Sequence, residues 1–167
     1  REPTQTDLAY LAGIIDGEGT LTIMYNSGRN VGYFSIGPRM IIANLSDDLF
    51  IWLGNLLYVG TIKDARKYRG GTCKQNDMSG LKVGDLLKRL LPYLIIKKKQ
   101  AELIIRFVDL RMQVQTGVYT PEMLEIFWKV RRLNLDQKRF DQLVQRVRTS
   151  QHAEILLPHL ETTSQMA

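Results

Sequence analysis

A stripe of small residues inside a predicted helix constrains the fold of this chain most. Leu8, Leu11 and Ile15 recur with helical spacing over residues 7–17, which predicts an amphipathic helix there. A second face of the same helix carries small residues spaced four apart, namely Ala9, Gly13 and Gly17. Glycine inside a helix costs about 1 kcal/mol relative to alanine, so such a stripe requires a reason. Close approach of a second helix backbone is the commonest one, and we expect a helix–helix contact along this face.

Hairpins and helices are expected to alternate along the rest of the chain. Extended runs at 20–25 and 31–43 predict one β-hairpin, and runs at 58–67 and 72–79 predict another. Pro38 favours a bulge or an edge position within its strand. Helices are expected at about 46–57, 83–91 and 97–116, and from Thr120 onwards. This α-ββ-α-ββ-α order predicts a single α+β domain over 1–167, with an antiparallel sheet, a core of about 7–115 and a helical extension of about 120–160.

The positive charge of the chain is concentrated in its middle third. The whole sequence has a formal charge of +6, whereas residues 60–106 hold twelve basic and four acidic residues, or +8, and the remainder carries −2. A concentrated basic region favours a polyanion partner, nucleic acid before membrane, although a solvated lysine-rich face is an equal alternative on charge alone. No apolar run approaches the ~20 residues of a transmembrane helix, so no membrane partner is expected.

The remaining composition excludes several kinds of site. A single cysteine, Cys73, excludes an intramolecular disulfide framework and fits a reducing compartment. His152 and His159 have no third metal ligand nearby in sequence, so both are expected as surface or core residues, and Trp52 and Trp128 as core residues. The chain begins with Arg rather than Met, which leaves a preceding transit segment open. We expect an intracellular protein, in either an organelle (chloroplast or mitochondrion) or the prokaryotic cytoplasm.

The segment Leu11–Gly19, Leu-Ala-Gly-Ile-Ile-Asp-Gly-Glu-Gly, resembles the signature of the LAGLIDADG homing endonucleases, Leu-Ala-Gly-Leu-Ile-Asp-Ala-Asp-Gly. Ile14, Gly17 and Glu18 depart from that signature conservatively in size or charge. The lysine-rich segment Pro92–Ala101 and the order of elements are also similar to the family, so the resemblance covers about residues 7–110. It implies a Mg²⁺-dependent DNA endonuclease whose antiparallel sheet forms a DNA-binding saddle. Mn²⁺ or Ca²⁺ is expected to substitute in the site, and no small-molecule cofactor is expected.

The resemblance also implies a dimer and a set of catalytic residues. One copy of the motif implies a homodimer that cuts both strands of a partly palindromic DNA target. The expected dimer interface consists of Ala9, Ala12, Gly13, Asp16 and Gly17. Glu18 is the expected catalytic acid and metal ligand, assisted by the carbonyl oxygen of Gly17, because Mg²⁺ prefers hard oxygen ligands. Lys97 is expected near the scissile phosphate, and Lys98 takes that place if the match to the family is shifted by one residue. Asn44 is expected either to position water or to cap the following helix.

The predicted DNA contacts follow from strand alternation, which determines the side chains that share a face. Polar and basic side chains on one face of the sheet can enter a major groove, where arginine and glutamine contact base edges and lysine more often contacts phosphate. Arg39, Arg66 and Gln75 are the expected base readers, although Arg66 has an uncertain face. The full predicted DNA surface is Thr20, Thr22, Met24, Asn26, Arg29, Tyr33, Ser35, Arg39, Lys63, Arg66, Lys67, Arg69, Lys74, Gln75, Asn76 and Lys98.

Two alternatives keep the fold without the cutting. One is an intron maturase that binds RNA, and the other is a DNA-binding regulator. The presence of an acid at Glu18 and a lysine at Lys97 favours the endonuclease, because a pure binder requires neither. Glutamate in place of aspartate at position 18 makes the acidic side chain one methylene longer, so we expect its metal coordination geometry to differ from that of the family signature.

Overall fold

The computed structural model describes residues 1–27, 34–56, 60–68 and 71–160. Its elements follow the predicted order of helix, hairpin, helix, hairpin and helix, with further helices after it. They are α1 (Gln5–Glu18), β1 (Gly19–Ser27), β2 (Phe34–Asn44), α2 (Asp47–Leu56), β3 (Thr61–Tyr68), β4 (Gly71–Ser79), α3 (Lys82–Leu90), η1 (Leu91–Tyr93), α4 (Lys98–Arg111), α5 (Pro121–Asn134), α6 (Gln137–Arg148), α7 (Ala153–Leu156) and η2 (Leu157–His159). The predicted α+β class is confirmed. No described helix is both long and apolar enough to cross a membrane.

Helix α1 begins and ends where the sequence predicts. Thr4 is the N-cap and forms a capping box with Asp7, in which each side chain accepts a hydrogen bond from the other residue's backbone N–H. The apolar stripe Leu8, Leu11 and Ile15 is buried. The helix stops at Gly19, where a Cβ atom would lie 2.7 Å from the Cα atom of Ile15. This close approach requires glycine at the junction between the helix and the first strand.

The four strands form one antiparallel sheet in the order β1-β2-β4-β3. The register pairs Thr22 with Arg39 and Ile41 with Asp77. Pro38 lies opposite Ile23 without a bulge, and the β2–β4 pairing starts only at Arg39, so the strand is locally an edge at Pro38. The alternation is regular along β1 and β2. One face of the sheet therefore belongs to the core and the other carries the polar positions.

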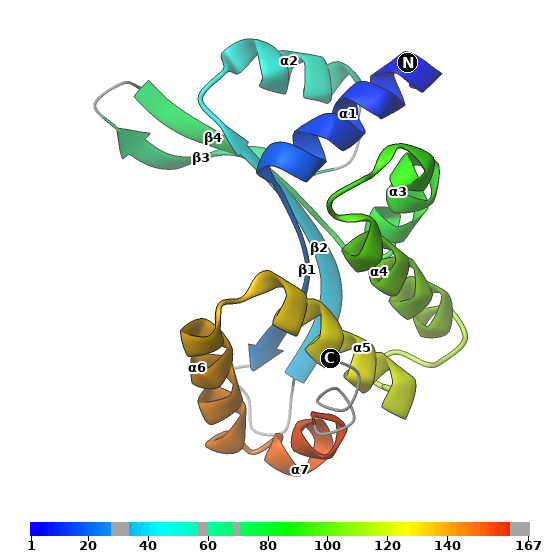
Figure 1. Cartoon of the computed structure of the whole chain (residues 1–167), viewed down its shortest axis with the longest axis vertical. Coiled ribbons are helices and arrows are strands. Elements are labelled where there is room, and N and C mark those ends of the chain that lie inside the picture. Colours follow the sequence, from blue (N-terminus) through cyan, green and yellow to red (C-terminus); the bar gives the residue numbers. More distant parts are fainter. Residues whose placement is uncertain (28–33, 57–59, 69–70, 161–167) are drawn as a thin grey trace.

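The helices cover one side of a curved sheet. Figure 1 shows the long β1–β2 ribbon with α3 and α4 along its convex side and α5 crossing its lower end, while the middle of the concave side stays uncovered and α6 lies at one end of it. A continuous hydrophobic core runs from Leu8 to Leu156. Trp128 is fully buried in this core, and its indole N–H donates to the Leu156 carbonyl at 2.7 Å. The last helices are thereby attached to the body of the protein.

Some boundaries differ from the sequence prediction for local reasons. Helix α4 ends at Arg111 rather than near residue 116, and the chain then turns through Gly117, which has a φ of 88°. The Arg111 guanidinium donates to the carbonyl oxygens of Gln115 and Val118 and holds this turn closed. Trp52 is only half-buried and packs edge-on against exposed Tyr10 at 5.1 Å, so the prediction of a core position holds for Trp128 alone.

Candidate active site and nucleic-acid interface

The structure brings together two of the predicted catalytic residues at the end of α1. Glu18 is exposed there, and the Asn44 side-chain amide donates a short hydrogen bond to its carboxylate. The side-chain oxygen of Asn44, Oδ1, accepts a hydrogen bond from the Ser46 backbone N–H at 2.8 Å, and this bond fixes the direction of the side-chain NH₂ group. Ser46 caps the first turn of α2, because its hydroxyl oxygen accepts a hydrogen bond from the Leu49 backbone N–H at 3.3 Å. Asn44 therefore orients Glu18, and Ser46 caps the helix.

Asp16 ties the segment that carries the predicted lysine to α1. Its carboxylate accepts hydrogen bonds from the backbone N–H groups of Ile95 at 2.7 Å, Ile96 at 3.2 Å and Lys97 at 2.9 Å. Burial acts to raise the pKa of Asp16, but these three N–H donors outweigh it, and the pKa is lowered. Asp16, which is predicted at the dimer interface, is partly buried and directs its carboxylate at the Ile95–Lys97 backbone of its own chain.

Lys97 lies beneath the C-terminal end of α1. Its ammonium donates to the carbonyl oxygens of Ile15, at 2.8 Å, and Asp16. Burial lowers the pKa of Lys97, while the nearby Asp16 carboxylate acts in the opposite direction. The ammonium therefore lies at the C-terminal end of α1, the negative end of the helix dipole. Lys98, the alternative register, is exposed at the start of α4.

One face of α1 is open along the small-residue stripe. Ala9, Gly13 and Gly17 are exposed, and a Cβ atom built at either glycine would meet no atom of the described residues within 4 Å. A hollow of about 490 Å³ runs along this face; it is lined by Ala9, Tyr10, Gly13, Ile14, Gly17, Glu18, Asn44, Ser46 and Leu49. Ala12, also predicted at the dimer interface, is instead fully buried in the core, because it lies on the same side of the helix as Leu8.

The predicted metal ligands, Glu18 and Gly17, are both exposed at the C-terminal end of α1. Within the described residues, no three His, Cys, Asp or Glu side chains come close enough to hold a metal ion. The Glu18 carboxylate and the Gly17 carbonyl are nevertheless hard oxygen donors at one exposed point, which is the ligand chemistry that Mg²⁺ prefers. These residues fit a divalent cation when a second set of the same donors is supplied from outside the chain.

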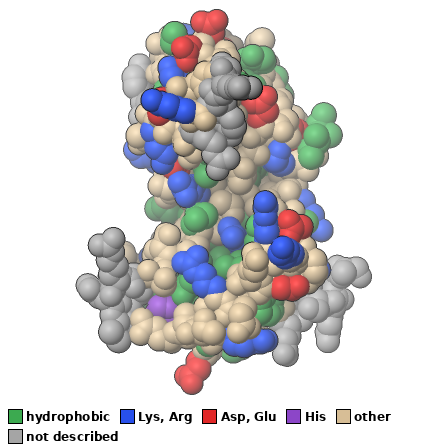
Figure 2. Space-filling model, turned by 90° about the vertical axis from the view of Figure 1, so that its left-hand side faces the viewer, with side chains coloured by type: hydrophobic (Ala, Val, Ile, Leu, Met, Phe, Trp, Pro, Cys, Tyr) green, Lys and Arg blue, Asp and Glu red, His purple; other side chains and the backbone are tan. Residues whose placement is uncertain are grey.

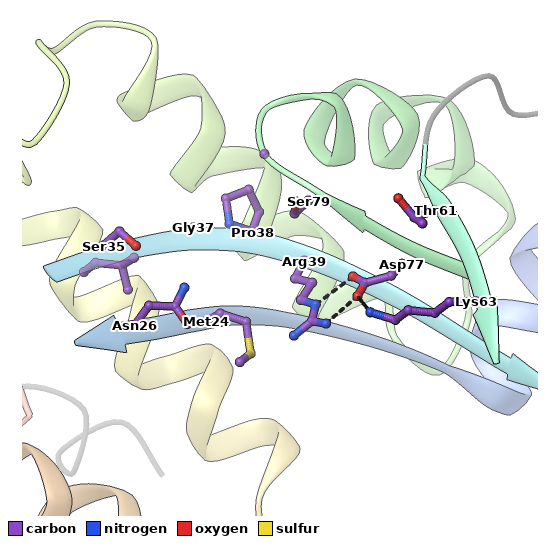
Figure 3. Close-up of a pocket in the computed structure, with 12 residues that line it drawn as sticks. Met24, Asn26, Ser35, Gly37, Pro38, Arg39, Thr61, Lys63, Asp77 and Ser79 are labelled. Atoms are coloured by element: carbon purple, nitrogen blue, oxygen red, sulfur yellow. Dashed lines mark hydrogen bonds and ion pairs between the residues drawn. The ribbon is translucent and has the colours of Figure 1, made fainter. Parts of the chain in front are cut away.

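The uncovered face of the sheet holds a second hollow, of about 440 Å³. It spans all four strands, and five of the predicted DNA-binding residues line it, namely Met24, Asn26, Ser35, Arg39 and Lys63. Figure 3 shows Arg39, Asp77 and Lys63 gathered at one end of this hollow, with Asn26 and Ser35 at the other. The predicted face of the first hairpin is therefore the face that the structure leaves open.

The charged end of this hollow is an ion-paired group. The Arg39 guanidinium donates two hydrogen bonds to the Asp77 carboxylate, one of them from Nε at 2.7 Å, and the Lys63 ammonium lies 2.8 Å from the same carboxylate. The hydrogen bond from Arg39 lowers the pKa of Asp77 to about 2. Asp77 remains ionised above that pH, so it fixes the directions of both cations and offsets part of their charge.

Other predicted DNA-binding residues lie away from the open face. Asn76 is 3% exposed, because it follows Gln75 directly and the strand period of two turns it toward the helices. Lys74 shares that orientation and pairs with Asp47 of α2 at 2.7 Å. Thr22 has the predicted orientation but is 4% exposed, since the Arg131 guanidinium of α5 covers it and donates to its hydroxyl at 3.2 Å.

The remaining predicted contacts divide into three sets. Gln75 is paired with Ala43 and Lys63, on the side of the strand that faces the hollow, and its amide lies 3.5 Å from Asp77. Thr20 and Lys67 are exposed on their strands. Arg29, Tyr33, Arg69 and the side chain of Arg66 lie outside the described residues.

A second basic region was hidden in the sequence by averaging over the chain. Residues 129–148 contain seven basic and two acidic side chains, while the acidic residues elsewhere outside 60–106 offset them in the sum. Counting charge in a short moving window would have found the region. Figure 2 views the open side of the sheet and shows Lys and Arg side chains on both sides of its narrowed middle.

The fold is shared with proteins that cut DNA. The homing endonuclease I-CvuI, in a complex with an I-CreI target and Mg that shows the DNA uncleaved, superposes with a TM-score of 0.62 at 21% identity, over 87% of this chain and 97% of that one. The archaeal intron-encoded homing endonuclease I-Vdi141I, complexed with DNA, gives a TM-score of 0.65 at 14% identity, over 79% of this chain and 86% of that one.

A longer neighbour matches this chain over about half of its own length. The LAGLIDADG homing endonuclease I-SmaMI, bound to cleaved DNA, gives a TM-score of 0.56 at 17% identity, over 86% of this chain and 49% of that one. No family model matches the sequence, and neither does any curated protein. The likeness is therefore one of fold.

Proposed function

We propose that this chain, which has the fold of the LAGLIDADG homing endonucleases, is itself a site-specific endonuclease that makes a double-strand break in a partly palindromic DNA target as a homodimer. The observation that carries the proposal is the exposed Glu18 carboxylate, oriented by Asn44, at the end of a helix face that the chain leaves open. A protein that only binds nucleic acid has no use for an oriented acid at that point.

The open face of α1 supports assembly from two copies. Gly13 and Gly17 carry no neighbour where a side chain would project, although glycine inside a helix is unfavourable. Two such helices can approach closely along these glycines. The exposed apolar side chains of Tyr10 and Ile96, which are 59% and 72% exposed, extend the surface that a second copy would cover. The match to half of a longer neighbour agrees with a pair of such units.

The residues at the seam have distinct chemical roles in this proposal. Glu18 and the Gly17 carbonyl of each copy would hold a divalent metal ion, which when bound supplies charge neutralisation at the phosphate and a more acidic water. Asn44 orients the Glu18 carboxylate. Lys97 supplies positive charge beside the end of α1, where it stabilises negative charge that develops on phosphoryl oxygens. Asp16 holds the Lys97 backbone in place.

Cleavage of a plasmid library with randomised inserts tests the proposal. Purified protein with Mg²⁺ should linearise a subset of the plasmids, and sequencing of the linear products should reveal a long, partly symmetric site. Glu18→Gln should abolish cutting and leave binding to that site largely intact. Glu102→Gln, the same change at an exposed position of α4, serves as the control. Tight binding without cleavage by the wild-type protein would instead indicate a regulator.

Gly13→Val tests the dimer separately. The single chain offers open space at this position, so the variant should remain folded while the valine keeps two helices apart. Sedimentation should show a dimer for the wild type and a monomer for the variant. Gly54→Val makes the same change at an exposed glycine of another helix, α2, and should remain dimeric. A Gly13→Val protein that still sediments as a dimer contradicts the proposed crossing point.

A further inference from the structure

The Arg39 guanidinium uses only one of its donor edges within the chain. Its Nε atom donates to one oxygen of the Asp77 carboxylate at 2.7 Å, and Nη2 donates to the other oxygen. These two parallel bonds occupy the Nε–Nη2 edge of the planar group. Among the described residues, Nη1 of Arg39 has no hydrogen-bond acceptor. The end of the guanidinium, where Nη1 and Nη2 each hold one N–H in the same direction, is therefore left for a ligand.

Asp77 holds this free edge in one direction. Ile41 is paired with Asp77 across β2 and β4, so Arg39, two residues before Ile41, lies diagonally opposite Asp77 on the same face of the sheet. From the other side, β3 places the Lys63 ammonium 2.8 Å from the same carboxylate. The Asp77 side chain is 13% exposed, and its pKa of about 2 keeps it charged. A carboxylate fixed from two neighbouring strands restricts the orientation of the guanidinium that it binds.

Arg39 lies in the open hollow of the sheet. It belongs to β2, an interior strand in the order β1-β2-β4-β3, and it lines the hollow of about 440 Å³. Figure 3 shows its side chain between Met24 on one side and Asp77 with Lys63 on the other. A DNA duplex seated on this face would present a groove to the interior strands and its backbones to the outer ones. The free edge of Arg39 would therefore meet the edge of a base.

The chemistry of the two free donors selects the base. In the major groove only guanine presents two acceptors side by side, O6 and N7, which two parallel N–H groups of an arginine match. A phosphate also offers paired acceptor oxygens, but the Asp77 carboxylate beside the guanidinium would repel its negative charge and would not repel a neutral base. We propose that Asp77 is a positioning residue for sequence recognition, which directs the free edge of Arg39 at O6 and N7 of one guanine in each half of the DNA target.

This inference rests on the proposed function, because it assigns one base of the same DNA target to Arg39. It also gives a role to an acid on a surface that binds a polyanion, where a negative charge by itself opposes binding. An arginine without a fixed partner can turn toward any acceptor and loses rotamer freedom when it binds. An arginine that is already oriented loses less, and it distinguishes a guanine from the other bases more sharply.

Binding selections from a library of randomised DNA duplexes test the assignment. The wild-type protein should select guanine at one pair of symmetry-related positions, with a preference of about 5-fold to 150-fold over the other bases. Arg39→Gln should replace this guanine with adenine, the base that glutamine matches, and leave the other positions unchanged. Asp77→Asn should select the same site but lose most of the preference for that guanine. Lys63→Gln, which also removes an ion pair with Asp77, is the matched control and should lower affinity while it keeps the guanine.

A second variant covers the case in which Asp77→Asn does not fold. Asp77→Glu keeps the negative charge but moves the carboxylate by one methylene, so it should also weaken the preference. The contacted atom is identified with 7-deazaguanine, which lacks the N7 acceptor and still pairs with cytosine. Placed at the selected position, it should lower wild-type affinity about tenfold and leave the affinity of Arg39→Ala unchanged.

The outcomes separate this inference from the proposed function. A folded Asp77 variant with the full guanine preference overturns the positioning role. A selected sequence that Arg39→Gln alters at no position overturns the base contact and indicates a phosphate contact instead. Both results leave the endonuclease proposal standing, whereas a wild-type protein that selects no DNA sequence overturns both.

Discussion

The two basic regions of this molecule differ in how their charges are held. On the sheet and the helices behind it, many cations have acidic partners within the chain: Arg39 and Lys63 share Asp77, Lys88 pairs with Asp109, and Arg106 pairs with Glu122. The cations of this region without an ion pair among the described residues are Lys67, Lys82, Lys97, Lys98 and Lys99. In the C-terminal region most cations have no acidic partner among the described residues, namely Arg131, Arg132, Lys138, Arg146 and Arg148. Net charge alone ranks the first region, at +8 over residues 60–106, above the second, at +5 over residues 129–148.

The difference teaches that net charge and available charge are separate quantities. A cation bound to a carboxylate has a fixed direction, which suits a contact that must distinguish one base from another. A cation without a carboxylate retains its full charge for a phosphate. Under the proposed function, the paired cations would suit directed contacts to DNA bases, and the unpaired cations would suit electrostatic attraction of DNA phosphates.

Detaching the C-terminal helices gives the largest expected effect on this comparison. Trp128→Ala removes a fully buried indole and its hydrogen bond to Leu156, and should destabilise the protein by about 4 kcal/mol. Urea unfolding followed by far-UV circular dichroism measures the loss. Trp52→Ala, at a half-buried indole, should cost clearly less. Equal losses at the two positions would mean that the C-terminal helices are not anchored through Trp128.

Removing the shared carboxylate of the paired region should have the next largest effect. Asp77→Asn leaves Arg39 and Lys63 facing each other without an anion, and a pKa near 2 for Asp77 corresponds to a loss of about 2 kcal/mol in unfolding free energy. By contrast, Arg146→Gln in the unpaired region should leave stability nearly unchanged. Chemical denaturation of both variants measures the two losses in unfolding free energy. Similar losses would contradict the expected difference between the paired and unpaired regions.

The pH dependence of the Asp77 contribution sharpens the same point with a smaller effect. Because its pKa is lowered from 3.8 to about 2, the carboxylate stabilises the folded state fully above pH 3.8, and the stabilisation is lost as pH falls toward 2. The difference in unfolding free energy between wild type and Asp77→Asn should therefore shrink to roughly half by pH 3. A difference that stays constant between pH 6 and pH 3 contradicts the ion pair.

The smallest expected effect concerns the attachment of the unpaired region to the sheet. Asn134→Ala removes one hydrogen bond to the Leu21 carbonyl and should cost about 1 kcal/mol. Asn26→Ala, at an exposed position of the same strand β1, should cost almost nothing. A thermal melt of each variant is sufficient. Equal midpoints would show that the end of α5 is held by packing alone.

Local signals in the sequence predicted the elements well. Leu8, Leu11 and Ile15 form the buried face of α1 as predicted, because helix periodicity depends only on near neighbours. Strand alternation likewise placed Met24 and Ser35 at the open face. The predictions for Ala12 and Asn76 were wrong for one shared reason. Each residue is adjacent in sequence to an exposed one, but its own side chain points to a different face of the helix or strand and is buried.

Long-range contacts could not be predicted in this way. Thr22 faces the open side as alternation requires, yet Arg131 covers it from 109 residues away. The three N–H groups that surround the Asp16 carboxylate come from about 80 residues further along the chain. The pairing of Arg39 and Lys63 through Asp77 joins three strands. Such contacts depend on how the elements pack, which periodicity does not encode.

The two-residue period of the strands has a consequence for how such a protein can change over generations. On β1 and β2 the side chains that fill the core and those that line the open hollow largely alternate, so Met24, Asn26 and Ser35 can vary with little effect on their buried neighbours Ile23 and Tyr25. Preference for a target and robustness of the fold can thus drift independently at these positions. Asp77 is the exception, since one substitution there would alter both at once.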